Sequence, residues 1–404
     1  MAVIAIVACC DTKYHEIAFA RQRILDSGNE ALVIDIATGP DVRYKADITR
    51  EEVLSAGGYT WDQVHALAKS DAISAMTESI GRMMQKLHEE KRMSGVLGMG
   101  GLQNTVVCSA AFRKLPYGFP KMICSTIASG YRYFDTVVGD KDITVMPSIV
   151  DFAGMNPINE VTIGNAIAAL IGMVQYGGHP IDTKGKRYVA TTLMGITNDT
   201  VMRAADTLTG RGIGVISFHS TGIGGRVMEE MIREGIFSGV MDLCLHEMTA
   251  EYLGNVGYSR GAERRLCAAA EAGIPALVVP GGIDFACLAR EDFRPDEEER
   301  GYVWHNRDLT HTRMHEYEIL DITQTICERL NRSKGKTEVI LPMGGLRTLS
   351  YPGEFFHKPE TIRKMKEIFE RELKPEIVFR TFDLNFCDPE FADICADEMT
   401  KLLN

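Results

Sequence analysis

The sequence predicts an α/β protein of two domains, each a mostly parallel, doubly wound sheet of the Rossmann type with βαβ crossovers. Short apolar segments alternate with segments of helical period along the chain, which is typical of parallel sheets. Twice, at residues 98–101 and 222–225, an apolar strand runs into a Gly-x-Gly-Gly loop that a helix follows. At 404 residues the chain is also too long for one ordinary core, so we expect two domains.

The first half opens with an apolar strand, because residues 3–8 are all Val, Ile or Ala. Apolar residues then recur at helical spacing, and Gly28 ends the helix. The same reasoning predicts the other elements of this half. They are strands at 31–36, 95–98, 121–124 and 143–147, and helical segments at 14–27, 50–55, 61–69, 71–91, 104–113 and 159–175.

A linker is predicted at residues 179–185, where glycine, proline and charged residues separate two periodic regions. The predicted domains are therefore 1–178 and 186–404. The second half repeats the alternation of strands and helices. Its predicted strands are 188–194, 215–218, 240–245, 276–279 and 338–341, and its helices are 200–208, 226–234, 260–272, 317–332, 360–372 and 389–402.

Charge and composition exclude some classes of partner. The formal net charge of −11 argues against binding to nucleic acid or an anionic membrane, because no basic face is available. The longest apolar stretch, around 166–174, is shorter than the roughly 20 residues of a membrane span. Ten cysteines without a Cys-x-x-Cys motif predict reduced thiols. We therefore expect a cytoplasmic protein.

The glycine loops predict anion sites. A strand that ends in glycines at a helix N-terminus offers backbone N–H groups and a positive dipole end to a phosphate. In the first half, Asp11-Thr12-Lys13 follows the first strand, and 98–105 and 125–130 follow later strands. Each also has a structural interpretation, as a helix cap, a packed turn or a polar loop. Neither Gly-x-Gly-x-x-Gly nor a Walker A motif is present, so NAD and P-loop sites are not predicted.

The second half offers residues suited to acid–base chemistry. His219 precedes the second glycine loop, Arg226 follows it, and Glu247 comes after another predicted strand. A general acid or base and an anion clamp would be well placed there, although hydrogen-bonded scaffolding and a surface ion pair are the structural alternatives. His311 and His315 have the i, i+4 spacing of a helical metal pair, but no third ligand is near in the sequence.

These motifs resemble the ATP-binding family named after the tomato mosaic virus resistance protein, and the likeness covers the whole chain in register. It rests on 10–13, the glycine loop with Thr105, 125–130, 147–156, 218–226, 280–284, 304–306, 341–345 and 388–392. The resemblance implies two α/β domains, a nucleotide site in the first, and dimers. It also implies a TIM-barrel partner, which would here be a separate protein.

Two departures from the family pattern matter. Met99 and residues 102–104 replace small residues in the first glycine loop, which narrows access to a phosphate. Near the C-terminus, Leu384 and Phe386 flank Asn385 where the family tends to place a histidine. A different nucleotide or a sugar phosphate is therefore an open alternative to ATP.

The sequence thus predicts an ATP-binding or related nucleotide-binding protein with Mg²⁺ as cofactor. Lys13 would contact phosphate, Thr105 and the amides of Gly100 and Gly101 would cradle it, and Asp11 or Asp151 would hold Mg²⁺ or ribose. The full predicted set is Asp11, Thr12, Lys13, Gly98, Gly100, Gly101, Thr105, Ser125, Thr126, Ser129, Gly130, Asp151 and Asn156.

Two alternatives stay open. One is an enzyme for a small carboxylate or carbonyl substrate in a cleft between the domains, with His219 and Glu247 as acid and base and Arg226 as anion clamp. The other is a nucleotide-gated interaction module that works only with a TIM-barrel partner. An enzyme should turn over substrate alone, whereas a module should bind nucleotide without consuming it.

Overall fold

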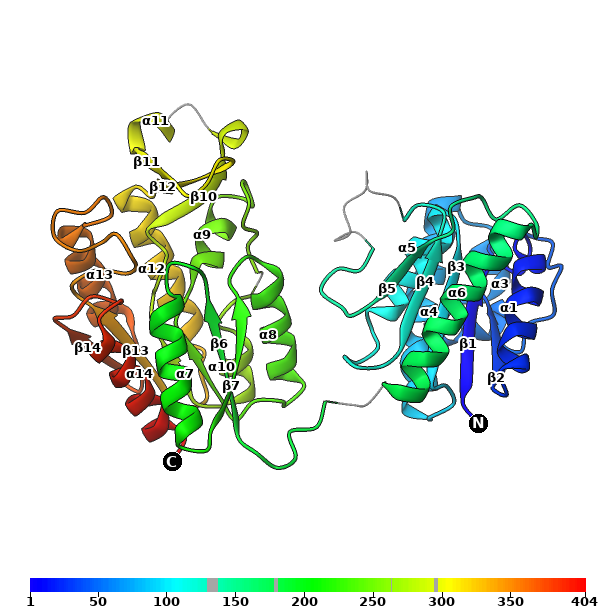
Figure 1. Ribbon diagram of the computed structural model, residues 1–404, viewed down its shortest axis with the longest axis horizontal. Helices are drawn as coiled ribbons and strands as arrows, with labels where there is room; N and C mark the ends of the chain where they lie inside the picture. The colour runs from blue at the N-terminus through cyan, green and yellow to red at the C-terminus, as the bar shows by residue number, and fades with distance from the viewer. Residues whose placement is uncertain (129–136, 178–180, 263, 294–296) are drawn as a thin grey trace. The chain divides into compact units, whose positions relative to one another are not determined.

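The structure, a computed structural model, describes residues 1–404 except 129–136, 178–180, 263 and 294–296 (Figure 1). It divides into two compact units, Met1–Asp182 and Thr183–Asn404, called unit 1 and unit 2 below. Each main sheet is parallel, with helices between successive strands. The predicted fold class, two α/β domains with mostly parallel sheets, is therefore confirmed.

Unit 1 is a doubly wound sheet with the strand order β2-β1-β3-β4-β5, all pairs parallel. In Figure 1 its strands stand side by side in that order, with helices on both faces. Its elements are β1 (Val3–Ala8), α1 (Tyr14–Asp26), β2 (Glu30–Asp35), α2 (Arg50–Gly57), α3 (Trp61–His65), α4 (Lys69–Glu89), β3 (Gly95–Gly100), α5 (Leu102–Phe112), β4 (Lys121–Ser125), β5 (Thr144–Pro147) and α6 (Pro157–Tyr176).

Alternation along the strands builds the two cores of unit 1, because successive side chains of a strand point to opposite faces. Ala5 and Val7 of β1 pack with α2, α4 and α5 on one face. Ile4 and Ile6 pack with α1 and α6 on the other. Strands buried on both faces explain the continuous apolar runs in the sequence.

Unit 2 has the same winding with one strand more, in the order β14-β13-β9-β8-β6-β7, again all parallel. Its elements are β6 (Tyr188–Leu193), α7 (Asn198–Gly210), β7 (Gly214–His219), α8 (Ile223–Arg233), β8 (Gly239–Asp242), α9 (His246–Tyr252), α10 (Ala268–Ala272), β9 (Ala276–Val278), β10 (Phe285–Ala289), α11 (Glu297–Arg300), β11 (Tyr302–Trp304), β12 (Leu309–Arg313), α12 (Glu316–Leu330), β13 (Thr337–Pro342), α13 (Pro359–Glu372), β14 (Val378–Phe382) and α14 (Pro389–Leu402).

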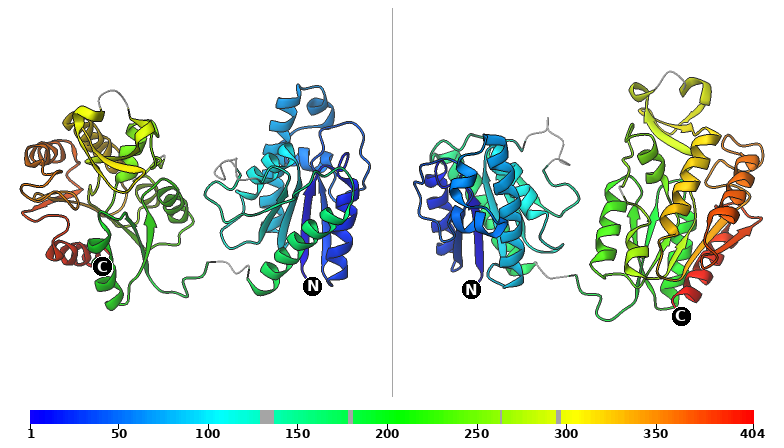
Figure 2. Two further views of the ribbon diagram at one scale, coloured as in Figure 1. Left: turned by 45° about the horizontal axis from the view of Figure 1, so that its top comes forward. Right: turned by 180° about the vertical axis from the view of Figure 1, so that it is seen from behind.

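A small antiparallel sheet in the order β10-β12-β11 is an addition that the sequence did not predict. It lies beyond the upper ends of the main strands of unit 2 in Figure 1, and the second view in Figure 2 agrees. Helices α7 and α14 cover one face of the main sheet, while α8, α12 and α13 pack on the other. The extra sheet therefore stands at the end of the main sheet where ligands of doubly wound folds bind.

The predicted helix over 260–272 is wrong in its first half, since only Ala268–Ala272 is helical. Arg264 and Leu266 have positive φ angles of 63° and 66°, a left-handed conformation that interrupts a helix. This backbone carries the Arg265 side chain into the sheet, where it meets buried carboxylates. The ion pairs override the helical pattern.

In the part of the chain that the structure describes, α6 alone is long and apolar enough to cross a membrane by length and composition. The core helix of a soluble protein passes the same test, and α6 packs on β3, β4 and α1 of unit 1. Its apolar residues Ile163, Ala166, Ile167 and Leu170 are buried in that core.

Candidate functional site

The strand order of unit 1 locates its candidate site. In a doubly wound sheet, ligands bind at the carboxyl ends of the strands where the order reverses, which here is between β1 and β3. A cavity of about 550 Å³ lies at that point. Residues that follow β1, from Cys9 to Lys13, and residues that follow β3, from Gly101 to Asn104, line it together with Thr38, Gly39 and residues of the 64–72 segment. The topology thus brings two of the predicted loops to one cavity.

Three helices begin at this cavity, and none of them has a side-chain cap. The N-cap residues are Lys13 for α1, Ala68 for α4 and Gly101 for α5, each without a side-chain hydrogen bond to the first turn. The other helices described in unit 1 are capped, α2 by Thr49, α3 by Thr60 and α6 by Asn156. Because the first N–H groups of a helix lack partners within it, three open N-termini at one cavity suit an anion.

Basic side chains line the same cavity. Lys13, Lys69 and His65 all line it. The Lys13 ammonium also donates to the carbonyl oxygen of Phe152 at 2.6 Å, which ties the first loop to the segment that precedes α6. Lys13 is thus already positioned beside the helix N-termini.

The glycines of the first loop have different roles. A side chain at Gly98 would meet Cys108 at 2.8 Å, so this glycine serves packing. Gly100 has a φ of +144°, a conformation that favours glycine, and its position faces the Asn104 side chain. At Gly101 the nearest group is the Thr126 hydroxyl at 3.5 Å, so the loop leaves space beside this residue.

Asn104, one of the departures from the family pattern, fastens the loop. Its amide nitrogen donates to the Met99 carbonyl at 2.7 Å, and its amide oxygen accepts from the Cys9 thiol at 2.8 Å. Burial raises the pKa of Cys9 well above the usual value, so Cys9 acts as a thiol donor. The larger side chain therefore braces β1 against β3.

Of the other predicted residues of unit 1, those that the structure describes do not line this cavity. The hydroxyls of Thr105 and Ser125 hydrogen-bond to each other at 2.6 Å and are buried. Asn156 caps α6, and Asp151 accepts from the backbone N–H of Phe152 at 2.7 Å. Ser129 and Gly130 lie outside the described residues.

The predicted Mg²⁺ ligands are thus in different surroundings. Asp11 lines the cavity and accepts from the Thr12 hydroxyl at 3.1 Å, whereas Asp151 does not line it. Across the described residues no group of three or more His, Cys, Asp or Glu side chains could hold a metal ion. One carboxylate together with phosphates is a common arrangement for Mg²⁺, and Asp11 fits it.

The second glycine loop, in unit 2, already holds an anion of the protein itself. The Glu247 carboxylate accepts from the N–H of Gly222 at 2.6 Å and of Gly225 at 2.9 Å, at the start of α8. A side chain at Gly225 would overlap this carboxylate. We had expected a small anionic ligand at this loop, and the structure corrects that expectation because Glu247 takes its place.

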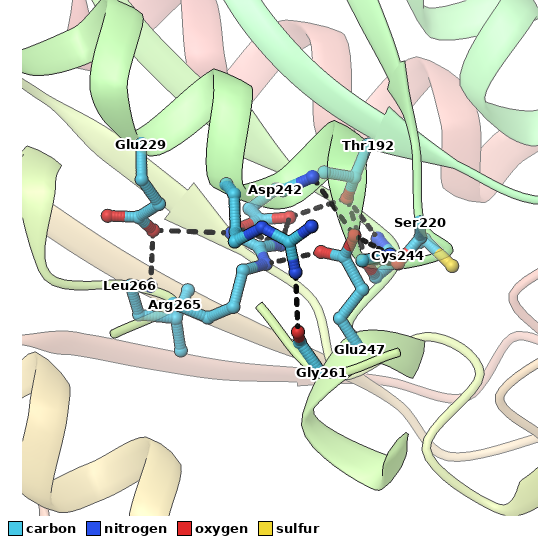
Figure 3. Close-up of polar contacts among 12 residues, drawn as sticks. Thr192, Ser220, Glu229, Asp242, Cys244, Glu247, Gly261, Arg265 and Leu266 are labelled. Atoms are coloured by element: carbon cyan, nitrogen blue, oxygen red, sulfur yellow. Dashed lines mark hydrogen bonds and ion pairs between the residues drawn. The ribbon is translucent and has the colours of Figure 1, made fainter. Parts of the chain in front are cut away.

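Glu247 belongs to a buried ion-pair cluster centred on Arg265 (Figure 3). Arg265 contacts Glu247 at 2.8 Å, Asp242 at 2.9 Å and Glu229 at 3.3 Å. Burial alone would lower the pKa of Arg265, but the three carboxylates outweigh it and raise the pKa. These contacts join α8, β8, α9 and the 264–268 segment, so the cluster holds unit 2 together.

A second cavity, of about 680 Å³, lies at the carboxyl ends of the strands of unit 2. Of the three residues predicted for acid–base chemistry and anion binding, His219 lines it, whereas Glu247 and Arg226 are not among its lining residues. Glu247 is held by Arg265, and Arg226 lies within reach of the Gly261 carbonyl at 3.4 Å. The structure does not bring these three residues together at this cavity.

The main polar residues of this cavity are His305, His311 and Arg347. Sequence reasoning gave no role to His305 or Arg347, and it considered His311 only as a metal ligand. The helical metal pair considered for His311 and His315 is wrong, because His311 lies on strand β12 and His315 is the N-cap of α12. Arg347 follows the Gly-Gly turn after β13. A strand followed by glycines and an arginine was therefore the sequence pattern that could have indicated Arg347.

The fold and the two cavities define a class of protein with two doubly wound α/β units, each with a cavity at its strand ends. Residues 2–179 match the N-terminal domain and residues 186–403 the C-terminal domain of the family described as "Uncharacterised protein family (UPF0261)". The chain belongs to this family. The resemblance seen in the sequence is thereby confirmed.

A UPF0261 protein of Clostridium tetani is 33% identical over 99% of this chain and 98% of its own length. The ToMV resistance protein Tm-1(GCR237) of Solanum lycopersicum is 29% identical over 98% of this chain, which spans 55% of the tomato protein. Among solved structures, MurG of Acinetobacter baumannii is 12% identical over 99% of both chains, with a TM-score of 0.23, too low to inform function.

Proposed function

We propose that unit 1 binds a phosphate-bearing nucleotide, with ATP as the first candidate, in the cavity between the ends of β1 and β3. The observation that carries the proposal is the convergence of three uncapped helix N-termini on one cavity. Each terminus offers unpaired N–H groups and about half a positive charge. The capped helices elsewhere in unit 1 make the contrast specific to this cavity.

The side chains of the cavity support a phosphate group at this position. Lys13 and Lys69 supply two positive charges, and the space beside Gly101 lets a ligand approach the start of α5. A cavity of about 550 Å³ is within the range of roughly 300–1,000 Å³ typical of small-molecule sites. Asp11 is the candidate to share Mg²⁺ with the phosphates when the metal is bound.

The sharpest test compares two substitutions at the N-cap of α5, Gly101→Asp and Gly101→Asn. Both side chains can cap the helix, and a φ of −84° with open space accepts either. They differ in charge alone, so the Asp variant should bind ATP at least about tenfold more weakly than the Asn variant, by repulsion of phosphate. Isothermal titration calorimetry measures both affinities, and a melting curve verifies that both fold.

Equal ATP affinity of the two variants would remove the helix N-terminus from the site and overturn the proposal. Phosphate release, measured on the same samples, separates the functional classes. Binding without release is expected of a nucleotide-gated module, whereas steady release would make the protein an ATPase.

We also propose that the protein works in the cytoplasm as a homodimer with a TIM-barrel partner. All ten cysteines are free thiols, which suits a reducing compartment. The tomato relative is longer than this chain, so it has room for a further domain. Light scattering during gel filtration tests the dimer, and co-purification with a TIM-barrel protein from the same genome tests the partner.

The rival enzyme hypothesis with His219, Glu247 and Arg226 has less support. Glu247 is fully buried and satisfied by Arg265 and two backbone N–H groups, so proton transfer from it would break the cluster of Figure 3. Turnover of a carbonyl or carboxylate substrate that is lost in Glu247→Gln but kept by a correctly folded control would revive it.

A further inference from the structure

The cavity of unit 2 is built by two sheets. Residues 194–196 after β6, His219 at the end of β7 and residues 347–349 after β13 form one side. The antiparallel sheet supplies the other side through Cys287, residues 303–306, Leu309 and His311. The chain order reverses between β6 and β8, so this cavity occupies the position at which doubly wound folds bind ligands.

Arg347 is the one guanidinium in the described lining of this cavity, and it is fully buried. It lies 4.0 Å from the ring centre of Phe285 and 4.1 Å from that of Phe356. Its Nη2 donates to Nδ1 of His311 at 2.8 Å and its Nε donates to the Thr348 carbonyl at 3.1 Å. Its Nη1 has no hydrogen-bond partner among the described residues.

A buried, unpartnered N–H group of a cation is costly, so it marks a place for an anion. The described lining residues include no Asp or Glu. Asp284 is buried nearby, and burial raises its pKa to about 6 against the lowering effect of Arg347. Asp284 therefore offsets part of the charge of Arg347 but does not line the cavity. The remaining charge suits a monoanion better than a polyphosphate.

The hydrogen bond between Arg347 and His311 determines the proton position on the histidine. A guanidinium only donates, so Nδ1 of His311 accepts and its proton sits on Nε2. Burial, reinforced by the charge of Arg347, lowers the pKa of His311 to about 3, so the ring is neutral. His311 thus presents a neutral N–H donor, beside the cationic one of Arg347.

The rest of the lining suits an apolar, flat ligand body. Trp304 is 55% exposed and Tyr258 60% exposed, and both line the cavity, so their rings are accessible to a ligand there. Met194, Ile196, Val303 and Leu309 add aliphatic walls. Aromatic rings of the protein stack well on flat ligand rings.

We propose that this cavity is a binding site for a small organic carboxylate with a flat apolar body, such as an aromatic acid. The carboxylate pairs with Nη1 of Arg347, and the body packs against Trp304 and Tyr258. The site is separate from the nucleotide site proposed for unit 1 and does not depend on it. A negatively charged group of single charge and a ring are the two features that it recognises.

The test uses three probes that separate these features. Benzoate has both, benzamide has the ring without the charge, and acetate has the charge without the ring. Calorimetry or ligand-observed NMR on the full-length protein should show benzoate binding at least about tenfold more tightly than either of the others, since one charged hydrogen bond contributes about that factor. ATP binding, measured on the same preparation, tests unit 1 independently.

Two variants locate the binding. Arg347→Lys keeps the positive charge but cannot hold His311 and a carboxylate with one planar group, so benzoate affinity should fall at least about tenfold. Trp304→Ala changes a largely exposed side chain and should weaken benzoate by about the same factor without unfolding the unit. Tyr317→Ala is the matched control, an aromatic that is 58% exposed in unit 2 and does not line the cavity.

Equal binding of benzoate and benzamide would remove Arg347 from recognition and overturn the proposal. Absence of benzoate binding at millimolar concentration would do the same, as would unchanged affinity in Trp304→Ala. A protein that binds benzoate but not ATP would instead contradict only the nucleotide site proposed for unit 1.

Discussion

The two units share one winding but differ in what stands at their helix N-termini. In unit 1 the glycine loop after β3 opens onto a cavity, and α5 begins there without a side-chain cap. In unit 2 the glycine loop after β7 is closed by Glu247, whose carboxylate accepts from Gly222 and Gly225. Of two loops that look alike in sequence, one thus opens onto a cavity and the other is filled by a carboxylate of the protein.

The comparison teaches that a strand, glycine loop and helix make an anion site only if no other strand end supplies a carboxylate to the loop. Glu247 follows β8, the strand that lies beside β6 in unit 2. The ion pair with Arg265 then neutralises the charge of Glu247. The anion site that we propose for unit 2 lies elsewhere, at Arg347 after β13.

The largest expected effect comes from removing Arg265, the partner of the carboxylate that fills the loop of unit 2. Arg265→Met would leave Glu229, Asp242 and Glu247 buried without their cation, which costs roughly 3–5 kcal/mol. Unit 2 should therefore unfold at a much lower urea concentration, while unit 1 keeps its ATP affinity. The chain has two tryptophans, Trp61 in unit 1 and Trp304 in unit 2, so Trp61→Phe makes fluorescence report unit 2 alone.

Arg203→Met is the matched control for that experiment. Arg203 pairs with Asp393 on the surface, with exposed fractions of 52% and 44%, so the loss should stay below about 1 kcal/mol. If Arg265→Met costs no more than Arg203→Met, the cluster does not hold unit 2 together. A shared unfolding transition in which unit 1 melts with unit 2 would show that the units are not independent.

The next largest expected effect is a loss of stability of unit 2 in acid. Burial lowers the pKa of His246 to about 4, with a further lowering by the charges of Arg347 and His219 and an opposing effect of the Gly282 carbonyl. Below pH 6.5 the unfolded chain binds this proton and the folded chain does not, so stability falls as pH falls from about 6.5 to 4. The loss is about 3 kcal/mol by linkage. Urea unfolding at a series of pH values measures it.

His246→Gln keeps a donor for the Gly282 carbonyl, which His246 Nδ1 reaches at 3.1 Å, and removes the titration. The variant should lose about half of the acid slope of unit 2, because burial lowers the pKa of His311 to about 3 and gives His311 a share of similar size. His15→Gln, at an exposed position of unit 1, should change nothing. An unchanged slope in His246→Gln would mean that other groups govern the acid response.

The parallel strands could be predicted from the sequence because they are buried on both faces, as in residues 3–8. The cavity of unit 1 could also be predicted, because Asp11 to Lys13 and Gly101 directly follow strands in the sequence. The turn at residues 264–266 could not be predicted, because ion pairs between Arg265 and residues distant in the sequence determine its backbone conformation. The small antiparallel sheet was missed because one of its strands, Tyr302–Trp304, is too short to show alternation.

A smaller expected effect tests whether Lys69 takes part in the site proposed for unit 1. Lys69 lines the cavity at the start of α4, whereas Lys86 lies near the end of the same helix, about 25 Å away at 1.5 Å per residue. Lys69→Ala should therefore weaken ATP about tenfold, or about 1.4 kcal/mol, and Lys86→Ala should not. Calorimetry at two salt concentrations measures both variants. Equal losses would point to a general effect of net charge in place of a contact.

The smallest expected effect asks whether the open N-terminus of α4 is kept open for a ligand. Ala68 has the extended backbone of an N-cap, with φ −60° and ψ 151°, but no side chain that can cap. Ala68→Asn should stabilise unit 1 by about 1 kcal/mol in the absence of ATP. With ATP bound the gain should shrink, because the ligand already satisfies the N–H groups that the new side chain would take. Melting curves with and without saturating ATP measure the difference, and Thr60→Asn, at the capped start of α3, should respond equally in both. A gain at Ala68 that ATP leaves unchanged would mean that the ligand does not reach α4, and the proposed site would then shrink to the starts of α1 and α5.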